Sequence, residues 1–151
     1  MSSKAWSRVV DRLSDEVTRR GGSAILDTDM LTMEPPVDSG EMVRAIRFSD
    51  QSGEDQTVTI TTGFAFRTAV SLNSEGGPEN VYRTVVAILD GYAAEVAEVA
   101  ADGTWLNVAA TIEPPDGRNR RSTQMAPAMR LTGLPVDHEH RRQIDPWPRP
   151  S

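Results

Sequence analysis

Apolar residues recur at helical spacing in two parts of the chain. The first part covers residues 4–20 and predicts an amphipathic helix. Its apolar stripe consists of Trp6, Val9, Val10, Leu13 and Val17. Arg12, Glu16 and Arg20 follow one another at intervals of four and are expected on the exposed opposite face. Two glycines then end the helix, because glycine adopts positive φ readily.

The second helical pattern begins after a glycine pair at Pro78 and runs to about Ala101. It contains two apolar stripes, formed by Val81, Val85, Ile88, Tyr92, Val96 and Val99 and by Tyr82, Val86, Leu89, Ala93, Ala97 and Ala100. Together they cover more than half of the circumference, so the second stripe is expected to face the first helix or a second subunit. In the latter case the protein is a homodimer through residues 81–100. Gly91 lies inside this pattern and is expected to allow a kink or a close backbone approach.

Alternation of apolar and polar positions predicts strands over residues 23–33, 42–48, 57–72, 104–112 and 122–132. The segment 57–72 is too long to be one straight strand in a domain of this size, so a hairpin is expected near Gly63. The preferred hairpin pairs Ile60 with Phe64, which leaves Arg67 off the core face. A sharply bent single strand is the alternative.

A five-residue frame occurs twice, at residues 32–36 and 111–115, and each copy ends in two prolines. Proline cannot donate to a sheet ladder, so each copy is expected to end a strand. Glu34 and Glu113 are then expected at sheet edges, where charge discourages further pairing. If the repetition reflects a real structural echo, both turns should lie at the same end of one sheet.

The order of elements is α-β-β-β-β-α-β-β. This order predicts an α+β fold, in which a mainly antiparallel sheet of about six strands packs with two helices. Residues 1–133 are expected to form a single domain. Residues 134–151 are expected to form a proline-rich, charged tail.

Composition narrows the classes of protein. Hydrophobic residues make up 38% of the chain and charged residues 25%, which is typical of a folded globular chain. The chain contains no cysteine, which excludes disulfides, thiolate metal sites and cysteine nucleophiles. No apolar run approaches the roughly 20 residues that cross a bilayer, and the charged start has no apolar secretion segment. A cytoplasmic location without membrane association is therefore expected.

Charge is distributed unevenly. Residues 26–112 hold fourteen acids and four bases, a net charge of −10, while the segments before and after them carry +2 each. Such a body repels nucleic-acid phosphates, so no nucleic-acid partner is expected. It would suit a basic protein partner, although a solubilising surface is the simpler interpretation.

Asp27, Thr28 and Asp29 follow the apolar residues 24–26. This stretch resembles the opening of haloacid-dehalogenase-type phosphatases, in which one aspartate attacks phosphate and the next acts as an acid. The family pattern also needs its threonine one place earlier than Thr32 and a later acidic pair for magnesium, and this chain has no Asp-Asp pair. Two acids at a solvent-facing strand edge are therefore the favoured interpretation.

The two histidines, His138 and His140, stand in an acidic context near the C-terminus. A stable metal site needs three or four converging ligands, and an exposed tail is a poor place for them, so no metal or cofactor is expected. The chain has no nucleophile elbow, so Ser-His-Asp hydrolysis is not expected either. The glycine pair at 76–77 is interpreted as a helix cap and not as a phosphate loop, because no lysine follows it.

Two C-terminal features could bind a partner. Arg118, Arg120 and Arg121 form a basic loop that could hold an anion or an acidic partner, with a solvated hairpin tip as the alternative. Trp147 lies between prolines and could anchor another protein. It could equally form a strap against its own domain.

These observations favour a non-enzymatic, acidic protein-binding module, either chaperone-like or a helper of the immunity or antitoxin type. The order of elements resembles that of small bacterial secretion chaperones and YbjN-like proteins, although topology alone gives no function. The alternative is a small-molecule-binding protein or enzyme with a pocket between sheet and helices. Its candidate residues are Asp27, Asp29, Arg44 and Arg67. A deep cleft that brings Asp29 and Arg67 together would favour this alternative.

Overall fold

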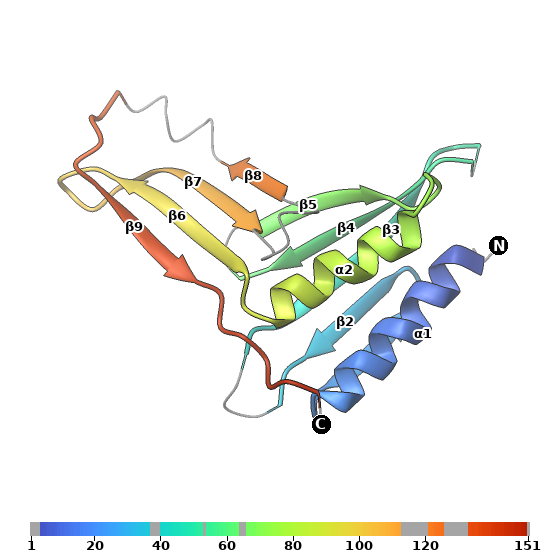
Figure 1. Ribbon diagram of the computed structural model, residues 1–151. Coiled ribbons are helices and arrows are strands. Elements are labelled where there is room, and N and C mark those ends of the chain that lie inside the picture. Colours follow the sequence, from blue (N-terminus) through green and yellow to red (C-terminus); the bar gives the residue numbers. More distant parts are fainter. Residues whose placement is uncertain are drawn as a thin grey trace.

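The computed structural model describes residues 4–36, 40–52, 54–63, 66–112, 121–125 and 133–150, with the backbone alone described for residues 107, 108 and 121–125. Within these residues the chain forms two helices and nine strands (Figure 1). The predicted α+β class, the two helices and the antiparallel pairing are confirmed. The strands form two sheets of five and four strands, where about six strands in one sheet were predicted.

Helix α1 (Lys4–Arg19) confirms the first predicted helix, and all five residues of its apolar stripe are buried. The helix ends at Gly21, whose φ is 83°, and the N–H of Gly22 donates to the carbonyl of Val17 at 3.0 Å. The prediction of an exposed opposite face was wrong for Glu16 and Arg20, which are buried. The second helix packs over them, and they pair with each other at that contact.

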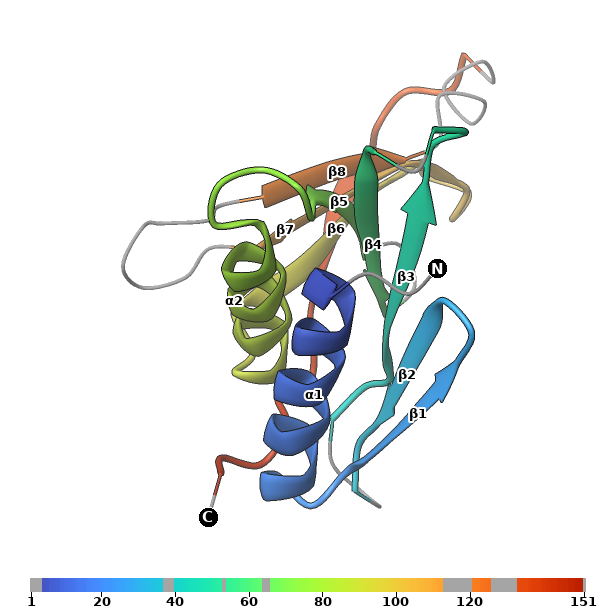
Figure 2. The same ribbon diagram turned by 90° about the vertical axis from the view of Figure 1, so that its right-hand side faces the viewer.

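The five-stranded sheet is an antiparallel meander in the order β1-β2-β3-β4-β5. Its strands are β1 (Ser23–Asp27), β2 (Met30–Glu34), β3 (Val43–Ser49), β4 (Gln56–Thr62) and β5 (Phe66–Ser71). Both helices lie on the same side of this sheet (Figure 2). The side chains on that side join the helix stripes in one hydrophobic core.

The segment predicted as one strand over residues 23–33 is a hairpin. Asp27 pairs with Met30, so Thr28 and Asp29 form a two-residue turn, in which Thr28 has a φ of 53°. The sequence did not indicate this turn, because glycine or asparagine usually occupies such a position. Strand β2 then ends at Glu34, before the two prolines, as predicted.

The hairpin predicted near Gly63 is confirmed, but its register was wrong. Ile60, which was expected opposite Phe64, pairs with Thr68. A register shift by an even number of residues leaves every side chain on its original face. The core face of β4 and β5 is therefore the predicted one, and Arg67 is exposed.

Helix α2 (Gly77–Leu89) ends twelve residues before the predicted position at Ala101. Gly91 has a φ of 86°, and the N–H of Tyr92 donates to the carbonyl of Ala87 at 3.0 Å, the same closure as at the end of α1. Residues beyond it form β6 (Ala93–Val99). Alanine and glutamate favour a helix locally, but β6 pairs with strands on both sides, and this tertiary pairing overrides local propensity.

The four-stranded sheet has the order β8-β7-β6-β9. Its other strands are β7 (Trp105–Ile112), β8 (Arg121–Met125) and β9 (His138–Gln143). Strand β7 matches the strand predicted over 104–112, and β9 lies in the segment expected as a tail. Strand β5 contacts β7 and β8, so β1 and β9 are the outer edges of the two sheets. The two predicted proline-ended strands belong to different sheets, and residues 113–115 lie outside the described residues.

The C-terminal segment after β9 packs onto the core. Ile144 and Trp147 are buried, and the indole N–H of Trp147 donates to the carbonyl of Glu41 at 2.7 Å. The backbone N–H of Trp147 donates to the carbonyl of Leu89 at 2.8 Å. Gly22 lies against the ring, where a Cβ atom would come within 2.5 Å of it. Trp147 is therefore a strap on its own domain, the alternative to an anchor for another protein.

Candidate functional site

One side of the five-stranded sheet is covered by neither described helix (Figure 2). Alternation along the strands separates the two sides: Val43 and Ala45 are buried in the core, whereas Arg44 between them is exposed. We call the helix-free side the open face. The residues of β2 to β5 that face this side are Thr32, Arg44, Ile46, Phe48, Thr57, Thr59, Thr61, Arg67, Ala69 and Ser71, of which Thr59 is buried.

Two arginines stand on the open face with a threonine between them. The register places Arg44 of β3 and Arg67 of β5 on either side of Thr61 of β4. Their Cα atoms are therefore about 10 Å apart, two strand spacings. Both side chains are exposed, and neither forms an ion pair within the described part of the chain. The open face thus presents two cations on a protein whose net charge is −6.

Apolar side chains accompany these cations. Phe48 on the open face is 50% exposed, and Ile46 on the same strand is half-buried. At the edge of the sheet, Ile25 of β1 is 56% exposed on this side, and Leu26 is 49% exposed on the helix side. Exposed apolar groups that gather beside polar ones mark interaction sites more often than isolated ones do.

Asp27 and Asp29 belong to the β1–β2 hairpin. Asp29 accepts hydrogen bonds at Oδ1 from Nη2 of Arg47 at 2.5 Å and from Nε at 3.0 Å. Asp27 is exposed and accepts a hydrogen bond of 3.5 Å from the hydroxyl of Thr28. Because both acids lie in an antiparallel hairpin and one is held by arginine, the likeness to haloacid-dehalogenase-type phosphatases ends with these few residues.

The four residues considered for a pocket are not gathered at one point. Arg44 and Arg67 share the open face, and Asp27 lies at its β1 rim. Asp29 is held by Arg47. It lies just before β2, and Arg67 is three strands further on, in β5. The structure therefore does not bring Asp29 and Arg67 together.

The predicted basic loop is described only at its end. Arg118 and Arg120 lie outside the described residues. Arg121 is the first residue of β8, and its backbone pairs with Ile112 of β7.

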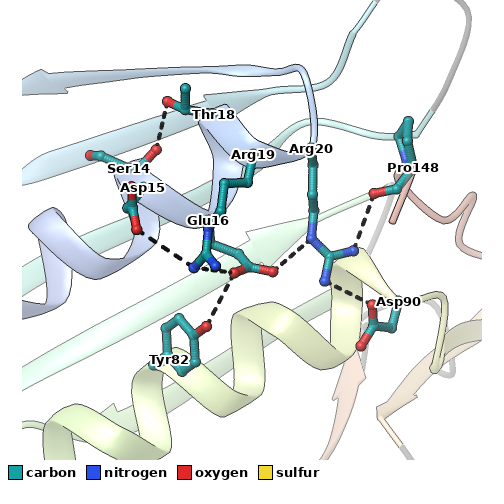
Figure 3. Close-up of polar contacts among 9 residues, drawn as sticks. All are labelled: Ser14, Asp15, Glu16, Thr18, Arg19, Arg20, Tyr82, Asp90 and Pro148. Carbon is teal, nitrogen blue, oxygen red and sulfur yellow. Dashed lines mark hydrogen bonds and ion pairs between the residues drawn. The ribbon is translucent and has the colours of Figure 1, made fainter. Parts of the chain in front are cut away.

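A buried polar network joins the ends of the two helices (Figure 3). The side chain of Arg20 is 3% exposed and donates to Glu16 at 3.0 Å and to Asp90 at 2.8 Å. It also donates to the carbonyl of Pro148 at 3.4 Å, and the hydroxyl of Tyr82 donates to Glu16 at 3.2 Å. Each of the three guanidinium nitrogens thus has an acceptor within this chain. The network holds the helices and the C-terminal strap together, and the guanidinium of Arg20 is fully used within it.

The exposed part of the helix contact carries an ion pair between Arg12 and Glu79. The Arg12 guanidinium also lies over the ring of Tyr82, 3.7 Å from its centroid. Hydrogen bonds from Arg12 and then from Arg83 lower the pKa of Glu79. Burial, and after it the charge of Glu16, raises the pKa of Tyr82 above its ordinary value of 10.0.

A second buried carboxylate fastens β9 to the rest of the protein. Glu95 of β6 accepts from Arg142 of β9, and Arg142 also donates to Glu41 in the segment before β3. The hydrogen bond with Glu41 is the main cause that raises the pKa of Arg142. Because one arginine joins a residue of β6 to a residue in the segment before β3, this cluster fastens β9 to both.

The histidines of β9 are exposed. His138 lies 2.9 Å from Asp137, and the ring of His140 is 6.4 Å from that of Trp105. In the portion of the chain that is described, no three histidine, aspartate or glutamate side chains converge where a metal ion could bind.

Comparison with protein-family models, with curated proteins and with solved structures finds no match to this chain. Neither described helix has the length and apolar character of a helix that crosses a membrane. Function is therefore inferred from the surfaces of the protein alone.

Sequence reasoning missed the exposed residues Ile25, Leu26 and Phe48. Residues 24–26 are a continuous apolar run, which is typical of a strand buried on both faces. Their exposure follows from the position of β1 at the edge of its sheet, and no local pattern in the sequence reports that position.

Proposed function

We propose that the protein binds another protein through the open face of its five-stranded sheet. The observation that supports this most directly is the pair of exposed arginines, Arg44 and Arg67, without carboxylate partners in the described chain. The exposed ring of Phe48 lies on the same side of the sheet, which neither described helix covers, four residues along β3 from Arg44. Aromatic and arginine side chains are the residue types enriched in protein–protein interfaces.

The chemistry of the open face favours one kind of partner. Two cations about 10 Å apart, with an aromatic ring further along the same face, suit a surface that carries both acidic and apolar side chains. A basic partner, which the acidic composition would suit, would meet other parts of the protein. Chaperone-like and immunity-like or antitoxin-like roles both remain forms of this proposal. A cytoplasmic setting belongs to it as well, since a chain without cysteine suits a reducing compartment.

A non-enzymatic role is proposed because the buried charged clusters are occupied within the chain. The guanidinium of Arg20 is used by Glu16, Asp90 and the C-terminal strap. Since Asp29 is also held by its own arginine, no observation favours the small-molecule alternative.

Affinity capture from the native host tests this proposal. The double variant Arg44→Glu/Arg67→Glu reverses the charge of the open face and should lose a partner that the wild type retains. The matched control is Arg141→Glu/Arg149→Glu, which reverses two exposed arginines on and after β9 and should retain it. Phe48→Lys should also lose the partner. If both open-face variants capture the same partner as the wild type, the proposal is wrong.

A further inference from the structure

Strand β1 is a free outer edge of the five-stranded sheet. Among the described strands it pairs with β2 alone, and it lies at the rim of the molecule (Figure 2). It contains no lysine, proline or bulge, the features that commonly keep an edge strand from pairing with another chain. Its central residues Ile25 and Leu26 are about half exposed.

The outward backbone groups of β1 belong to Ala24 and Leu26. In a hairpin with a two-residue turn, the residues that flank the turn exchange hydrogen bonds, and bonding then alternates along the strand. By the same alternation, Met30 bonds to β1, and its neighbour Asp29 should bond to β3. The N–H of Arg47 in β3 does donate to the carbonyl of Asp29, at 2.8 Å. The N–H and C=O groups of Ala24 and Leu26 therefore point away from the sheet.

We propose that a second copy of this chain pairs with β1 in an antiparallel manner, about a two-fold axis at Ile25. The pairing joins two five-stranded sheets into one sheet of ten strands. The proposed dimer does not depend on the proposed binding of a partner protein. The dimer uses the edge of the sheet, whereas the partner would bind the open face.

The sequence of β1 is complementary to itself in this register. Ala24 forms hydrogen-bonded pairs with Leu26 of the second copy, so a small side chain meets a large one on the helix side. On the other side, Ile25 meets its own copy at the axis. Asp27, the single charged residue of the strand, meets the hydroxyl of Ser23 and not another carboxylate. A shift by two residues would place Asp27 against Ile25 and lose this match.

Symmetry favours a second copy over a foreign strand. A two-fold contact requires that one patch complements itself, and β1 does so in side-chain size and in charge. The edge is only five residues long, so the interface is below the standard size and the dimer should be weak and reversible. Dimer formation is expected between roughly 10 µM and 1 mM.

Sedimentation equilibrium of the full chain over that range tests the proposal. The wild type should shift from monomer to dimer, and Ile25→Lys should remain monomeric because two lysines would meet at the axis. Phe48→Lys is the matched control, since Phe48 is exposed to a similar extent but lies on an inner strand of the sheet, and it should dimerise as the wild type does. Leu26→Pro, which removes one outward N–H without touching the β1–β2 hydrogen bonds, should also abolish dimers.

Charge variants at Ser23 test the register itself. Ser23→Lys creates two ion pairs with Asp27 across the axis and should tighten the dimer by roughly 2- to 30-fold, while Ser23→Glu should weaken it. A wild type that remains monomeric up to about 1 mM overturns the proposal. The proposal is equally wrong if such a monomer pairs through β1 with a different protein. Dimers that persist in both Ile25→Lys and Leu26→Pro would also overturn it, because they would lie on another surface.

Discussion

Strands β1 and β9 are the outer edges of the two sheets, and their sequences differ in kind. Strand β1 reads Ser-Ala-Ile-Leu-Asp, with one charged residue, whereas β9 reads His-Glu-His-Arg-Arg-Gln, with three charged residues and two histidines. Charged side chains on an edge discourage pairing with another chain. The comparison indicates that this protein protects one sheet edge and leaves the other able to accept a strand.

The two edges also differ in how they are fastened. Strand β9 is held by Arg142, which pairs with Glu41 and Glu95, and it continues into the strap that buries Trp147. Strand β1 is held by its hairpin and by contacts with α1 and has two exposed apolar side chains. Substitutions of the buried residues that fasten β9 and the strap should therefore affect stability, whereas substitutions of exposed residues on β1 should affect association.

The largest effect is expected for Trp147→Ala. Loss of a buried tryptophan should lower the free energy of unfolding by about 3–5 kcal/mol. The contrasting variant on the other edge is Ile25→Ala, which should change it by no more than about 0.5 kcal/mol, because Ile25 is largely exposed. Urea unfolding at low protein concentration measures both. Similar losses for the two variants would remove the distinction between the edges.

The next effect concerns the buried arginine that binds the strap. Arg20→Met leaves the carboxylate of Glu16 without its buried partner and should cost about 3 kcal/mol. Arg19→Met is the matched control, since Arg19 contacts the same carboxylate from an exposed position, and it should cost less than about 1 kcal/mol. Thermal unfolding of the two variants provides the test. Equal losses of stability in the two variants would show that the burial of Arg20 adds nothing to the free energy of unfolding.

A smaller and opposite effect is expected at the tip of the β1 hairpin. Thr28 has a φ of 53°, a conformation that is unfavourable for a β-branched residue, so Thr28→Gly should leave stability unchanged or raise it by up to about 1 kcal/mol. Thr61→Gly, within β4, should instead lower stability by about 1 kcal/mol. Chemical unfolding compares the pair. A clear loss of stability in Thr28→Gly would contradict the strained turn.

The smallest effect on stability is expected at Tyr82, in the contact between α1 and α2. Burial raises the pKa of Tyr82, so its contribution to stability is present below pH 10.0, the ordinary value, and is lost as the pH rises through the raised pKa. An alkaline titration followed by phenolate absorbance should show a late transition. The transition should disappear in Tyr82→Phe. If the most alkaline part of the titration curve is unchanged in Tyr82→Phe, the late transition does not belong to Tyr82.

The elements that the sequence predicted well depend on local patterns. The stripe of α1, the strand that became β7 and the hairpin near Gly63 follow from spacing and from one glycine. Gly91 was placed inside a helix because the alanines and glutamates after it suit a helix as well as a strand. Pairing with distant strands decided between the two, and local spacing carries no information on such pairing.

The candidate site was predictable in part. Arg44 and Arg67 were selected from the sequence, but their alignment on either side of Thr61 depends on two strand registers. Glu16 and Arg20 have the spacing of an exposed helix pair, and only the packing of α2 against α1 buries them. The prediction of a homodimer through residues 81–100 assumed that these residues form one long helix. Part of that segment is a strand, so we place the proposed dimer contact at β1 instead.

Amide hydrogen exchange at single-residue resolution tests the contrast between the two edges most directly. The outward amides of β1 belong to Ala24 and Leu26; those of β9 include Glu139 and Arg141, because the N–H of Ile144 donates to the carbonyl of Ala93 and bonding alternates from there. The account predicts that exchange at Ala24 and Leu26 slows as the protein concentration rises toward about 1 mM, while exchange at the two β9 amides stays fast. Exchange at Ala24 and Leu26 that is independent of concentration, or protection that appears on β9 instead, would contradict it.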